Sequence, residues 1–379
     1  MKINEIKISV FELPTNTAIC GMDEVPYGSR MRWQQRARHH QPDPVHVLHV
    51  STYAGIEGVC TVGDARYTSM RRRDLEHLRA LAIGQDPFER ERLDAKLRAA
   101  TRHIFTLPGW HGAFDNCLWD IAGKAANLPI CDLIGRARSR CPAYYNFNSS
   151  SAATAIDDSH KALAMGFTAL KDHCHSTPDQ NVANARAVRQ ALGDEILFFH
   201  DAASAPYTYV EALRVGRALE DLGFTWFEEP IADRDMPGLQ KLCDALSIPI
   251  LAPETLMHEL ELSALWLQMG ATDLLRANAR HGTTAALKLA HSAQLQQSTI
   301  EFNGPGGLFG LVHAHMVCAI ANTSYYEYFP NGSRDEVGRE IGLLNPPVPV
   351  DGHIAPPTGP GWGAEWDWEY FTKKRVAVL

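Results

Sequence analysis

Three carboxylates stand at the ends of three successive short apolar runs between residues 197 and 254. They are Asp201, Glu228 and Glu254, and their spacing of about 26 residues fits strand, loop, helix, loop, strand. A single acid in such a place is more typical of a helix cap. Three acids in register would meet at the face where parallel barrel strands end, and they would need a cation. An all-oxygen set of ligands favours Mg²⁺, so the sequence predicts a magnesium site at these residues.

The chain around these acids has the period of a parallel α/β barrel. A first strand is expected after Pro142, and further apolar runs begin near residues 168, 197, 225, 249, 273, 298 and 324. Helical patterns lie between these runs, and repeated strand and helix units predict a parallel barrel. The 379 residues exceed the roughly 250 of such a barrel. We therefore expect a second domain.

The residues before the barrel predict an α+β domain. Strand patterns cover residues 3–13, 45–53 and 59–62, and helical patterns cover residues 71–104 and 111–127.

Residues 15–41 lack any periodicity and are rich in Arg and His. A loop of this length is expected to be a lid that closes over an anion, with Trp33 among its contacts, or else a solvated basic loop. We place the N-terminal α+β domain at residues 1–135, the barrel at 136–330, and a Pro-rich tail at 331–379 that packs back on the N-terminal domain.

The composition indicates a globular protein that binds a small molecule. Hydrophobic residues make up 45% and charged residues 21%, and the formal net charge is −8. This charge offers no basic field to nucleic acid or an anionic membrane, and no apolar run reaches the roughly 18 residues of a membrane span. The eight cysteines include no Cys-x-x-Cys pair, and the first residues lack a signal-peptide core. We therefore expect reduced thiols and a cytoplasmic location.

Four stretches together resemble the mandelate racemase branch of the enolase superfamily. They are His111-Gly-Ala-Phe-Asp-Asn-Cys-Leu-Trp-Asp-Ile-Ala-Gly-Lys124, Trp226-Phe-Glu-Glu-Pro230, Glu254 after a Pro-Ile strand, and Thr358-Gly-Pro-Gly-Trp-Gly363. The resemblance implies an α/β fold, with an N-terminal α+β capping domain over a (β/α)₇β barrel that holds Mg²⁺. It also implies abstraction of the proton next to a substrate carboxylate, and a homo-oligomer. A divalent ion would offset the second negative charge that this abstraction creates.

The expected base departs from the family's pattern. Where many members have Lys-x-Lys, this chain has Lys171-Asp172-His173. Alternation places Lys171 and His173 inside the barrel, and Asp172 outside as an acceptor on the helix side. A histidine titrates near pH ~6.5, and Lys171 with a nearby metal should lower that pKa. We expect a neutral His173 to be the base, the alternative being a histidine that only fills polar space.

On the opposite side of the barrel the family's Asp–His dyad is missing. The Asp position falls on Ala277 or Asn278, depending on the count, and the His position on Glu301 or Phe302. The nearest candidate for a strand-six lysine base is Arg280, and an arginine stays protonated. The residues expected to bind the substrate are Trp33, Arg276, Asn278 and Arg280.

Two further acids are candidates for catalysis. Glu327 matches the strand-eight Glu that hydrogen-bonds the substrate carboxylate in mandelate racemase, and burial would keep it protonated. Its alternative is an acid paired with a nearby cation. Glu301 either protonates a leaving hydroxyl group or pairs with Lys171 or Arg276.

These residues favour a Mg²⁺-dependent lyase that removes the proton α to a carboxylate and eliminates water from a polyhydroxy (sugar) acid. The expected catalytic residues are Lys171, His173, Glu301 and Glu327. One alternative is a racemase or epimerase, which needs bases on both faces and would use Glu301 as the second. The other is a non-catalytic, metal-binding member of the fold.

Overall fold

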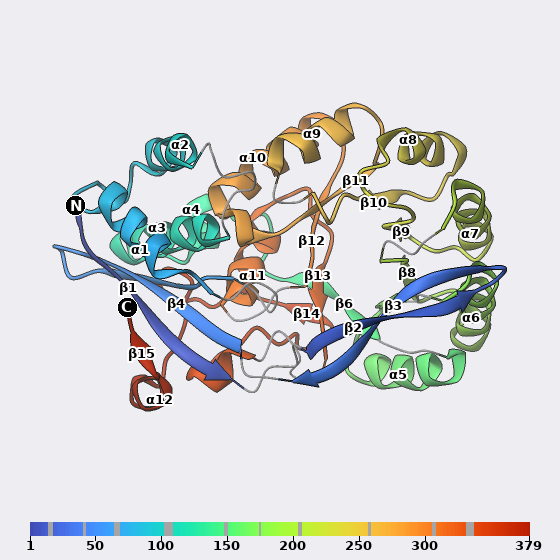
Figure 1. Cartoon of the computed structure of the whole chain (residues 1–379), viewed down its shortest axis with the longest axis horizontal. Helices are drawn as coiled ribbons and strands as arrows, with labels where there is room; N and C mark the ends of the chain where they lie inside the picture. Colours follow the sequence, from blue (N-terminus) through green and yellow to red (C-terminus); the bar gives the residue numbers. More distant parts are fainter. Residues whose placement is uncertain are drawn as a thin grey trace.

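The computed structural model describes residues 1–13, 18–40, 43–63, 69–101, 109–147, 151–173, 176–203, 207–256, 259–304, 308–330 and 337–379. An N-terminal α+β domain lies beside a barrel of parallel strands (Figure 1). Both chain ends lie on the side of the N-terminal domain (Figure 1). Among the described residues, no helix has the length and apolar character needed to cross a membrane.

The N-terminal sheet joins the two ends of the chain. Its order is β15-β1-β4-β5, and all its pairs are antiparallel. The strands are β1 (Ile3–Leu13), β4 (Asp43–Thr52), β5 (Glu57–Thr61) and β15 (Ala377–Val378). The helices of this domain are α1 (Arg72–Ala82), α2 (Arg90–Ala100), α3 (Trp110–Ala126) and α4 (Ile130–Ile134). The core residues of β1 include Ile8 and Phe11, which are fully buried.

A hairpin occupies most of the region in which the sequence predicted a lid loop without regular structure. β2 (Ala18–Tyr27) and β3 (Arg30–His40) pair antiparallel across Gly28 and Ser29. Gly28 has φ of 60°, which glycine adopts without strain. The apolar alternation of a strand is weak here because most of the hairpin's described side chains are exposed or half-buried, so neither face needs a regular row of apolar residues. Residues 15–17 and 41, which the prediction included, lie outside the described residues.

Eight parallel strands form the barrel in the order β13-β6-β7-β8-β9-β10-β11-β12, which confirms the barrel predicted from the strand and helix period. They are β6 (Cys141–Phe147), β7 (Ala169–Asp172), β8 (Leu197–Asp201), β9 (Trp226–Glu228), β10 (Ile250–Ala252), β11 (Leu274–Ala277), β12 (Ile300–Phe302) and β13 (Tyr326–Tyr328). The helices are α5 (Ala152–Ala164), α6 (Pro178–Leu192), α7 (Tyr209–Asp221), α8 (Met236–Ala245), α9 (Leu260–Gln268), α10 (Thr283–Leu295) and α11 (Phe309–Ala319).

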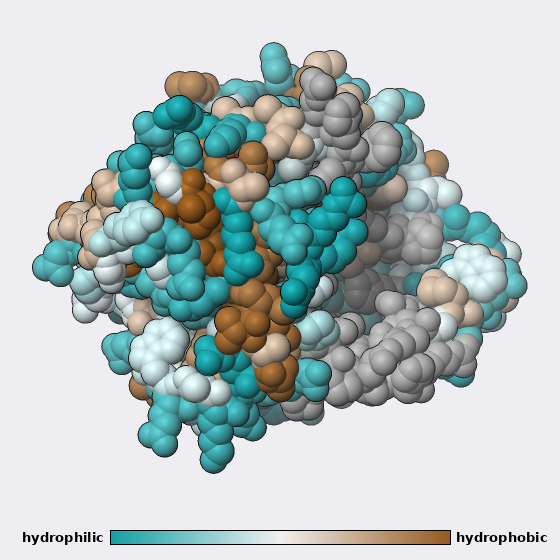
Figure 2. Space-filling view, turned by 60° about the vertical axis from the view of Figure 1, so that its left-hand side comes forward, coloured by the Kyte–Doolittle hydropathy of each residue, from teal (hydrophilic) through white to brown (hydrophobic). Residues whose placement is uncertain are grey.

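Short elements complete the chain. They are the 3₁₀ helices η1 (Ala279–His281) and η2 (Val337–Ile341), strand β14 (His353–Ile354), which pairs with β6, and helix α12 (Trp368–Lys374). Figure 2 shows a mainly hydrophilic surface on the side turned toward the viewer, with an apolar area near its middle.

An aromatic layer fills the barrel interior. Phe199 and Trp226 stack with their ring centroids 3.8 Å apart, and the Tyr144 ring meets Phe199 edge-on at 5.1 Å. Asp201 and Glu228 follow these two stacked rings by two residues on the same strands, so they face the same interior nearer the carboxyl ends. The layer therefore forms an apolar floor under the acids.

Helix α3 joins the N-terminal domain to the barrel, and it carries the motif at residues 111–124. The Asp120 carboxylate accepts hydrogen bonds from the backbone N–H of Val59 and of Trp362, each at 3.0 Å. The Asn116 side chain donates to the carbonyl oxygen of Ala279 and accepts from the backbone N–H of Thr283. This helix therefore fixes the loop that follows the sixth barrel strand.

Candidate active site

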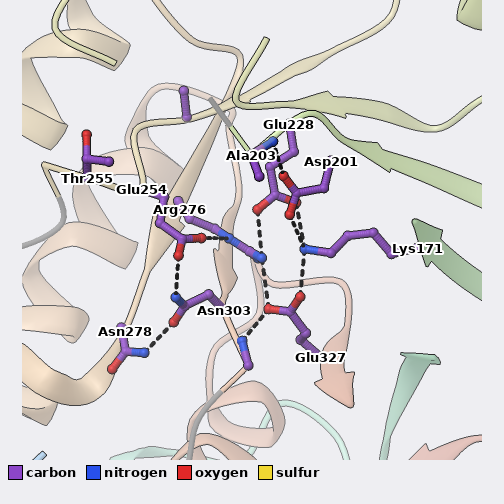
Figure 3. A network of polar contacts seen from close by, with 12 residues as sticks. Lys171, Asp201, Ala203, Glu228, Glu254, Thr255, Arg276, Asn278, Asn303 and Glu327 are labelled. Carbon is purple, nitrogen blue, oxygen red and sulfur yellow. Dashed lines mark hydrogen bonds and ion pairs between the residues drawn. The ribbon is translucent and has the colours of Figure 1, made fainter. Parts of the chain in front are cut away.

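The carboxylates of Asp201, Glu228 and Glu254 gather at the carboxyl end of the barrel (Figure 3). The first two end β8 and β9, and Glu254 follows β10 by two residues. Parallel strands end on one face, so neighbouring strands bring these side chains together. Glu327 of β13 lies against the same group (Figure 3). We call these four residues the acid cluster.

Lys171 enters the acid cluster from β7. Its Nζ atom lies 3.2 Å from Asp201 Oδ2, 2.9 Å from Glu228 Oε2 and 2.6 Å from Glu327 Oε1. The side chain is fully buried, so these ion pairs are shielded from water. In this structure Lys171 therefore forms ion pairs with the protein's own carboxylates.

Arg276 enters the acid cluster from β11, on the other side. Its Nη2 atom lies 2.7 Å from Glu228 Oε1 and 2.8 Å from Glu327 Oε2, and its Nε atom lies 3.4 Å from Glu254 Oε2. Its Nη1 atom donates to the Tyr144 hydroxyl at 3.3 Å. The sequence predicted that Arg276 binds the substrate, whereas the structure places it against the protein's own acids.

The charges of the cluster do not balance. Four carboxylates face two cations, Lys171 and Arg276, which leaves two negative charges if all the groups ionise. Burial raises the pKa of Glu228 to about 8, with Asp201 adding to the rise. Burial, Glu254 and Asp201 together raise the pKa of the neighbouring Glu229 to about 10. The excess negative charge of the cluster would therefore stabilise a further cation.

Glu327 is ionised, which corrects the prediction of a protonated acid at this position. Burial alone would raise the pKa of this carboxyl group, but Arg276 and Lys171 outweigh burial and hold it well below its usual range. The backbone N–H of Gly304 also donates to the carboxylate. The alternative, an acid paired with nearby cations, is what the structure shows.

His173 borders the cluster as the sequence predicted. Its Nε2 atom lies 3.2 Å from Asp201 Oδ2, and its Nδ1 atom has no hydrogen-bond partner among the described residues. Burial lowers the pKa of the imidazole to about 4, opposed by Asp201 and aided by Lys171. The predicted lowering of this pKa is thus present without a metal, and burial is its main cause.

A cavity of about 220 Å³ lies over the cluster. His173, Lys171, Asp201, Glu254, Arg276 and Glu327 border it, as do residues that the sequence analysis did not single out, namely Ala203, Glu229, Asn303 and Phe329. Asn303 lies two residues beyond Glu301, so alternation along β12 could have placed it on the inner face. Glu229 directly follows the predicted ligand Glu228, and alternation along a strand would turn its carboxylate away from the interior, so the sequence pattern did not indicate it.

Asn278 lies behind the cavity wall and does not border the cavity. Its side-chain oxygen accepts from the backbone N–H of Arg280 at 2.7 Å, and its amide donates to the Asn303 side chain (Figure 3). Asn303 in turn donates to Glu254 Oε1 at 3.1 Å. The predicted substrate contact is therefore a residue that orients Asn303 and, through it, Glu254. Arg280 is buried in η1 and does not border the cavity in the described part of the chain.

Trp33 lies on the outer face of the β2–β3 hairpin, with 65% of its surface exposed, so the structure does not support a contact with substrate. Residues on the opposite face of the hairpin turn inward. Tyr27 is buried, and its hydroxyl donates to the Ser176 carbonyl oxygen at 3.4 Å. Arg30 at the turn forms an ion pair of 2.5 Å with Glu211 of α7. The hairpin is thus attached to the barrel by Tyr27 and Arg30.

Glu301 does not reach the cavity. Its carboxylate accepts from the backbone N–H of Ser324 at 3.2 Å and of Tyr325 at 3.4 Å, and from the Thr299 hydroxyl at 2.9 Å. These partners precede their strands, so they lie at the amino end of the barrel. No backbone ladder joins β12 to β13 in the described structure, and Glu301 spans this seam. It forms no ion pair with Lys171 or Arg276, and burial raises its pKa.

Asp172 points to the outside of the barrel, where its Oδ1 atom lies 2.8 Å from Nδ1 of His200 on β8. The expected acceptor role is present, although this partner lies on a strand.

The donor set and its charge fit a divalent cation, although the present side-chain positions do not form a coordination shell. Asp201, Glu228 and Glu254 supply only oxygen atoms, and with every group ionised the acid cluster carries two more negative than positive charges. Lys171 and Arg276 lie between the carboxylates (Figure 3). Within the described ranges, no three Asp, Glu, His or Cys side chains are therefore arranged to hold an ion as they stand.

The chain is similar to proteins with named activities. The mandelate racemase / muconate lactonizing enzyme N-terminal domain matches residues 30–135, and the enolase C-terminal domain-like family matches residues 155–370. Arabinonate dehydratase of Saccharolobus solfataricus is 28% identical over 280 residues, which cover 71% of this chain and 72% of that protein. N-succinyl-L-Arg/Lys racemase of Bacillus cereus is 23% identical over 216 residues, or 56% of this chain and 58% of that protein.

A solved structure has the same fold along the whole chain. The crystal structure of D-glucarate dehydratase from Agrobacterium tumefaciens, complexed with magnesium, matches with a TM-score of 0.83 and 25% identity over 100% of both chains.

Proposed function

Because the chain belongs to the mandelate racemase / muconate lactonizing enzyme family of the enolase superfamily, we propose that it is a Mg²⁺-dependent dehydratase of a polyhydroxy (sugar) acid. The observation that carries this proposal is His173, a neutral imidazole on the cavity wall beside an acid cluster that is short of positive charge. Similarity to arabinonate and D-glucarate dehydratases supports the class of substrate.

In this proposal His173 removes the proton next to the substrate carboxylate and later donates it to the leaving hydroxyl group. Its Nε2–H donates to Asp201, and Nδ1 is then the basic nitrogen that takes the proton next to the substrate carboxylate. Asp201 stabilises the imidazolium that forms. The proton returns to the neighbouring hydroxyl group as its C–O bond breaks, so water leaves and an enol remains. The enol then becomes the keto-deoxy acid.

Asp201, Glu228 and Glu254 would hold the metal. A bound Mg²⁺ would supply the positive charge that offsets the second negative charge on the substrate carboxylate. Asn278 and Asn303 keep Glu254 in place, and the aromatic layer keeps water from the floor of the site.

The position of Glu301 disfavours the racemase alternative. Proton transfer across one carbon needs a base on each face, and Glu301 was the predicted second base. The structure holds that carboxylate at the seam between β12 and β13. Elimination with a single base needs no second group.

Proton NMR in deuterated water tests the reaction. The protein with Mg²⁺ is mixed with a panel of aldonic, aldaric and uronic acids. Loss of the signal beside the carboxylate, together with a keto-deoxy product, supports the dehydratase and identifies its substrate. Exchange or epimer formation without loss of water would overturn it in favour of a racemase. Absence of Mg²⁺ binding in calorimetry would favour a non-catalytic protein.

Substitution His173→Ala tests the base. Turnover should fall by roughly 10²- to 10⁴-fold, because a positioned base contributes about that much. Mg²⁺ binding, measured by calorimetry, should persist because His173 is not among the proposed ligands. Turnover close to that of the wild type would remove His173 from the mechanism.

A further inference from the structure

Arg276 is the cation that bridges two of the proposed metal ligands on neighbouring strands. Its Nη2 atom holds Glu228 at 2.7 Å and its Nε atom approaches Glu254 at 3.4 Å. The side chain is 1% exposed, and a guanidinium keeps its charge at any pH at which the protein folds. Arg276 therefore cannot leave these carboxylates by losing a proton, and a competing cation can displace it only if the side chain moves.

The surroundings of Arg276 offer it a second resting place within the site. Its Nη2 atom also lies 2.8 Å from Glu327, and Nη1 reaches the Tyr144 hydroxyl at 3.3 Å. Neither of these residues is a proposed metal ligand. A small rotation can therefore release Glu228 and Glu254 while the guanidinium keeps a carboxylate and a hydroxyl as partners. The contact with Glu254 is the longest of the ion pairs, and Asn303 keeps that carboxylate oriented after release.

We propose that Arg276 is an internal counter-cation that competes with a divalent cation for Glu228 and Glu254, and so sets the affinity of the free protein for the metal. The inference rests on the metal site of the proposed function and adds a residue to it. Before a metal binds, Arg276 offsets part of the negative charge on Glu228 and Glu254. The metal must therefore displace its contacts, and affinity is lower than the three carboxylates alone would give.

Calorimetric titration of the substrate-free protein with MgCl₂ and with MnCl₂ tests this competition. Arg276→Gln should bind either ion at least tenfold more tightly than the wild type. The same variant should melt at a lower temperature in EDTA, because four acids, three of them buried, then share one cation, and should gain more from added metal. Equal or weaker binding would overturn the proposal, since Arg276 would then organise the ligands without competing for them.

Two further variants keep the test decisive. Arg276→Lys retains the charge but cannot form the same pair of contacts, so its affinity should fall between those of Arg276→Gln and the wild type. If Arg276→Gln fails to fold, this variant carries the test, and an affinity no tighter than that of the wild type overturns the inference. Arg280→Gln removes the same charge outside the acid cluster and should change the dissociation constant by less than twofold.

Turnover separates this inference from the proposed function. Tighter metal binding by Arg276→Gln supports the counter-cation even if no acid sugar is dehydrated, and in that case the proposed function fails alone. Absence of metal binding in both the wild type and Arg276→Gln overturns the inference.

Discussion

The role of each residue in this site depends more on the groups that it contacts than on its residue type. Arg276, Glu301 and Glu327 were each candidates for contact with the substrate, with pairing inside the protein as the alternative for the two acids, and each has partners within the protein. A long charged side chain reaches over several ångströms, so its position on a strand does not decide which opposite charge it finds. His173 kept its expected place because a short, rigid ring one residue beyond β7 has few alternatives.

The pH dependence of turnover follows from the burial of His173. The base must be neutral, and burial holds its pKa at about 4, so kcat/KM should remain nearly level from pH 7 down to about 5. An ordinary histidine would halve kcat/KM near pH ~6.5. The profile should be measured at saturating Mg²⁺, so that metal loss does not shape the acid limb. An acid limb centred at 6.5 or above would contradict the structure.

Glu301 should matter for stability and not for chemistry. Glu301→Gln keeps an oxygen acceptor for the backbone N–H groups of Ser324 and Tyr325, so turnover should change less than about threefold. Glu301→Ala leaves those groups unpaired and should lower the free energy of unfolding by about 1 to 3 kcal/mol. Urea unfolding and turnover per folded molecule measure the two effects. A hundredfold loss of turnover in Glu301→Gln would restore the general-acid role.

Elements with a strong apolar period were predicted well, and the one without it was missed. The barrel strands bury both faces, so they appear as short apolar runs between helical patterns. Among the described side chains of the β2–β3 hairpin most are exposed or half-buried, so its sequence lacks the regular row of apolar residues that indicates a strand. Its best signal was Gly28-Ser29, a pair typical of two-residue hairpin turns.

Helix α3 and the loop after β11 lie so close together that the addition of one methyl group to the helix tests their contact. A Cβ atom at Gly112 would lie 1.8 Å from the Arg280 carbonyl oxygen, so Gly112→Ala must push the helix away from the barrel. We expect a loss of about 2 to 4 kcal/mol in the free energy of unfolding, measured in urea. Gly109→Ala, before the same helix, meets nothing within 4 Å and should be close to neutral. Equal effects would show that crowding is not the cause.

At the scale of the whole molecule, His315 joins parts of the chain that are distant in sequence. Its Nδ1 atom accepts from the Cys131 backbone N–H at 3.2 Å, and its Nε2 atom lies 3.2 Å from the Trp362 carbonyl oxygen. This pair of contacts needs a neutral ring with hydrogen on Nε2. Burial accordingly lowers the pKa of His315 to about 4. The α11 helix, the α4 helix and the C-terminal segment thus depend on one uncharged imidazole.

Stability should therefore fall as the solution becomes acidic. Folding lowers the pKa of His315 from its usual 6.5, so between pH 6.5 and 4 the unfolded chain binds more protons than the folded one. The stabilisation is complete above pH 6.5 and is lost as pH falls toward 4, with up to about 3 kcal/mol from this residue. Urea unfolding in EDTA at a series of pH values measures the slope.

A substituted protein isolates the contribution of this histidine. His315→Gln should be less stable at pH 7 and should lose less stability than the wild type between pH 6.5 and 4. An unchanged slope would assign the acid sensitivity to other buried histidines, such as His111 and His313, whose pKa values burial also lowers.

The sequence by itself determined the architecture, and it determined which strands bring the acids at their carboxyl ends together. Strand and helix periods are local, and parallel strands necessarily end on one face, so the spacing of Asp201, Glu228 and Glu254 was enough to bring them together. Only the tertiary structure decided how charge is distributed there. Whether Arg276 and Lys171 reach a substrate or those acids depends on distances of a few ångströms between strands that are far apart in sequence. Electrostatic energy in a buried site depends steeply on such distances, and no local pattern records them.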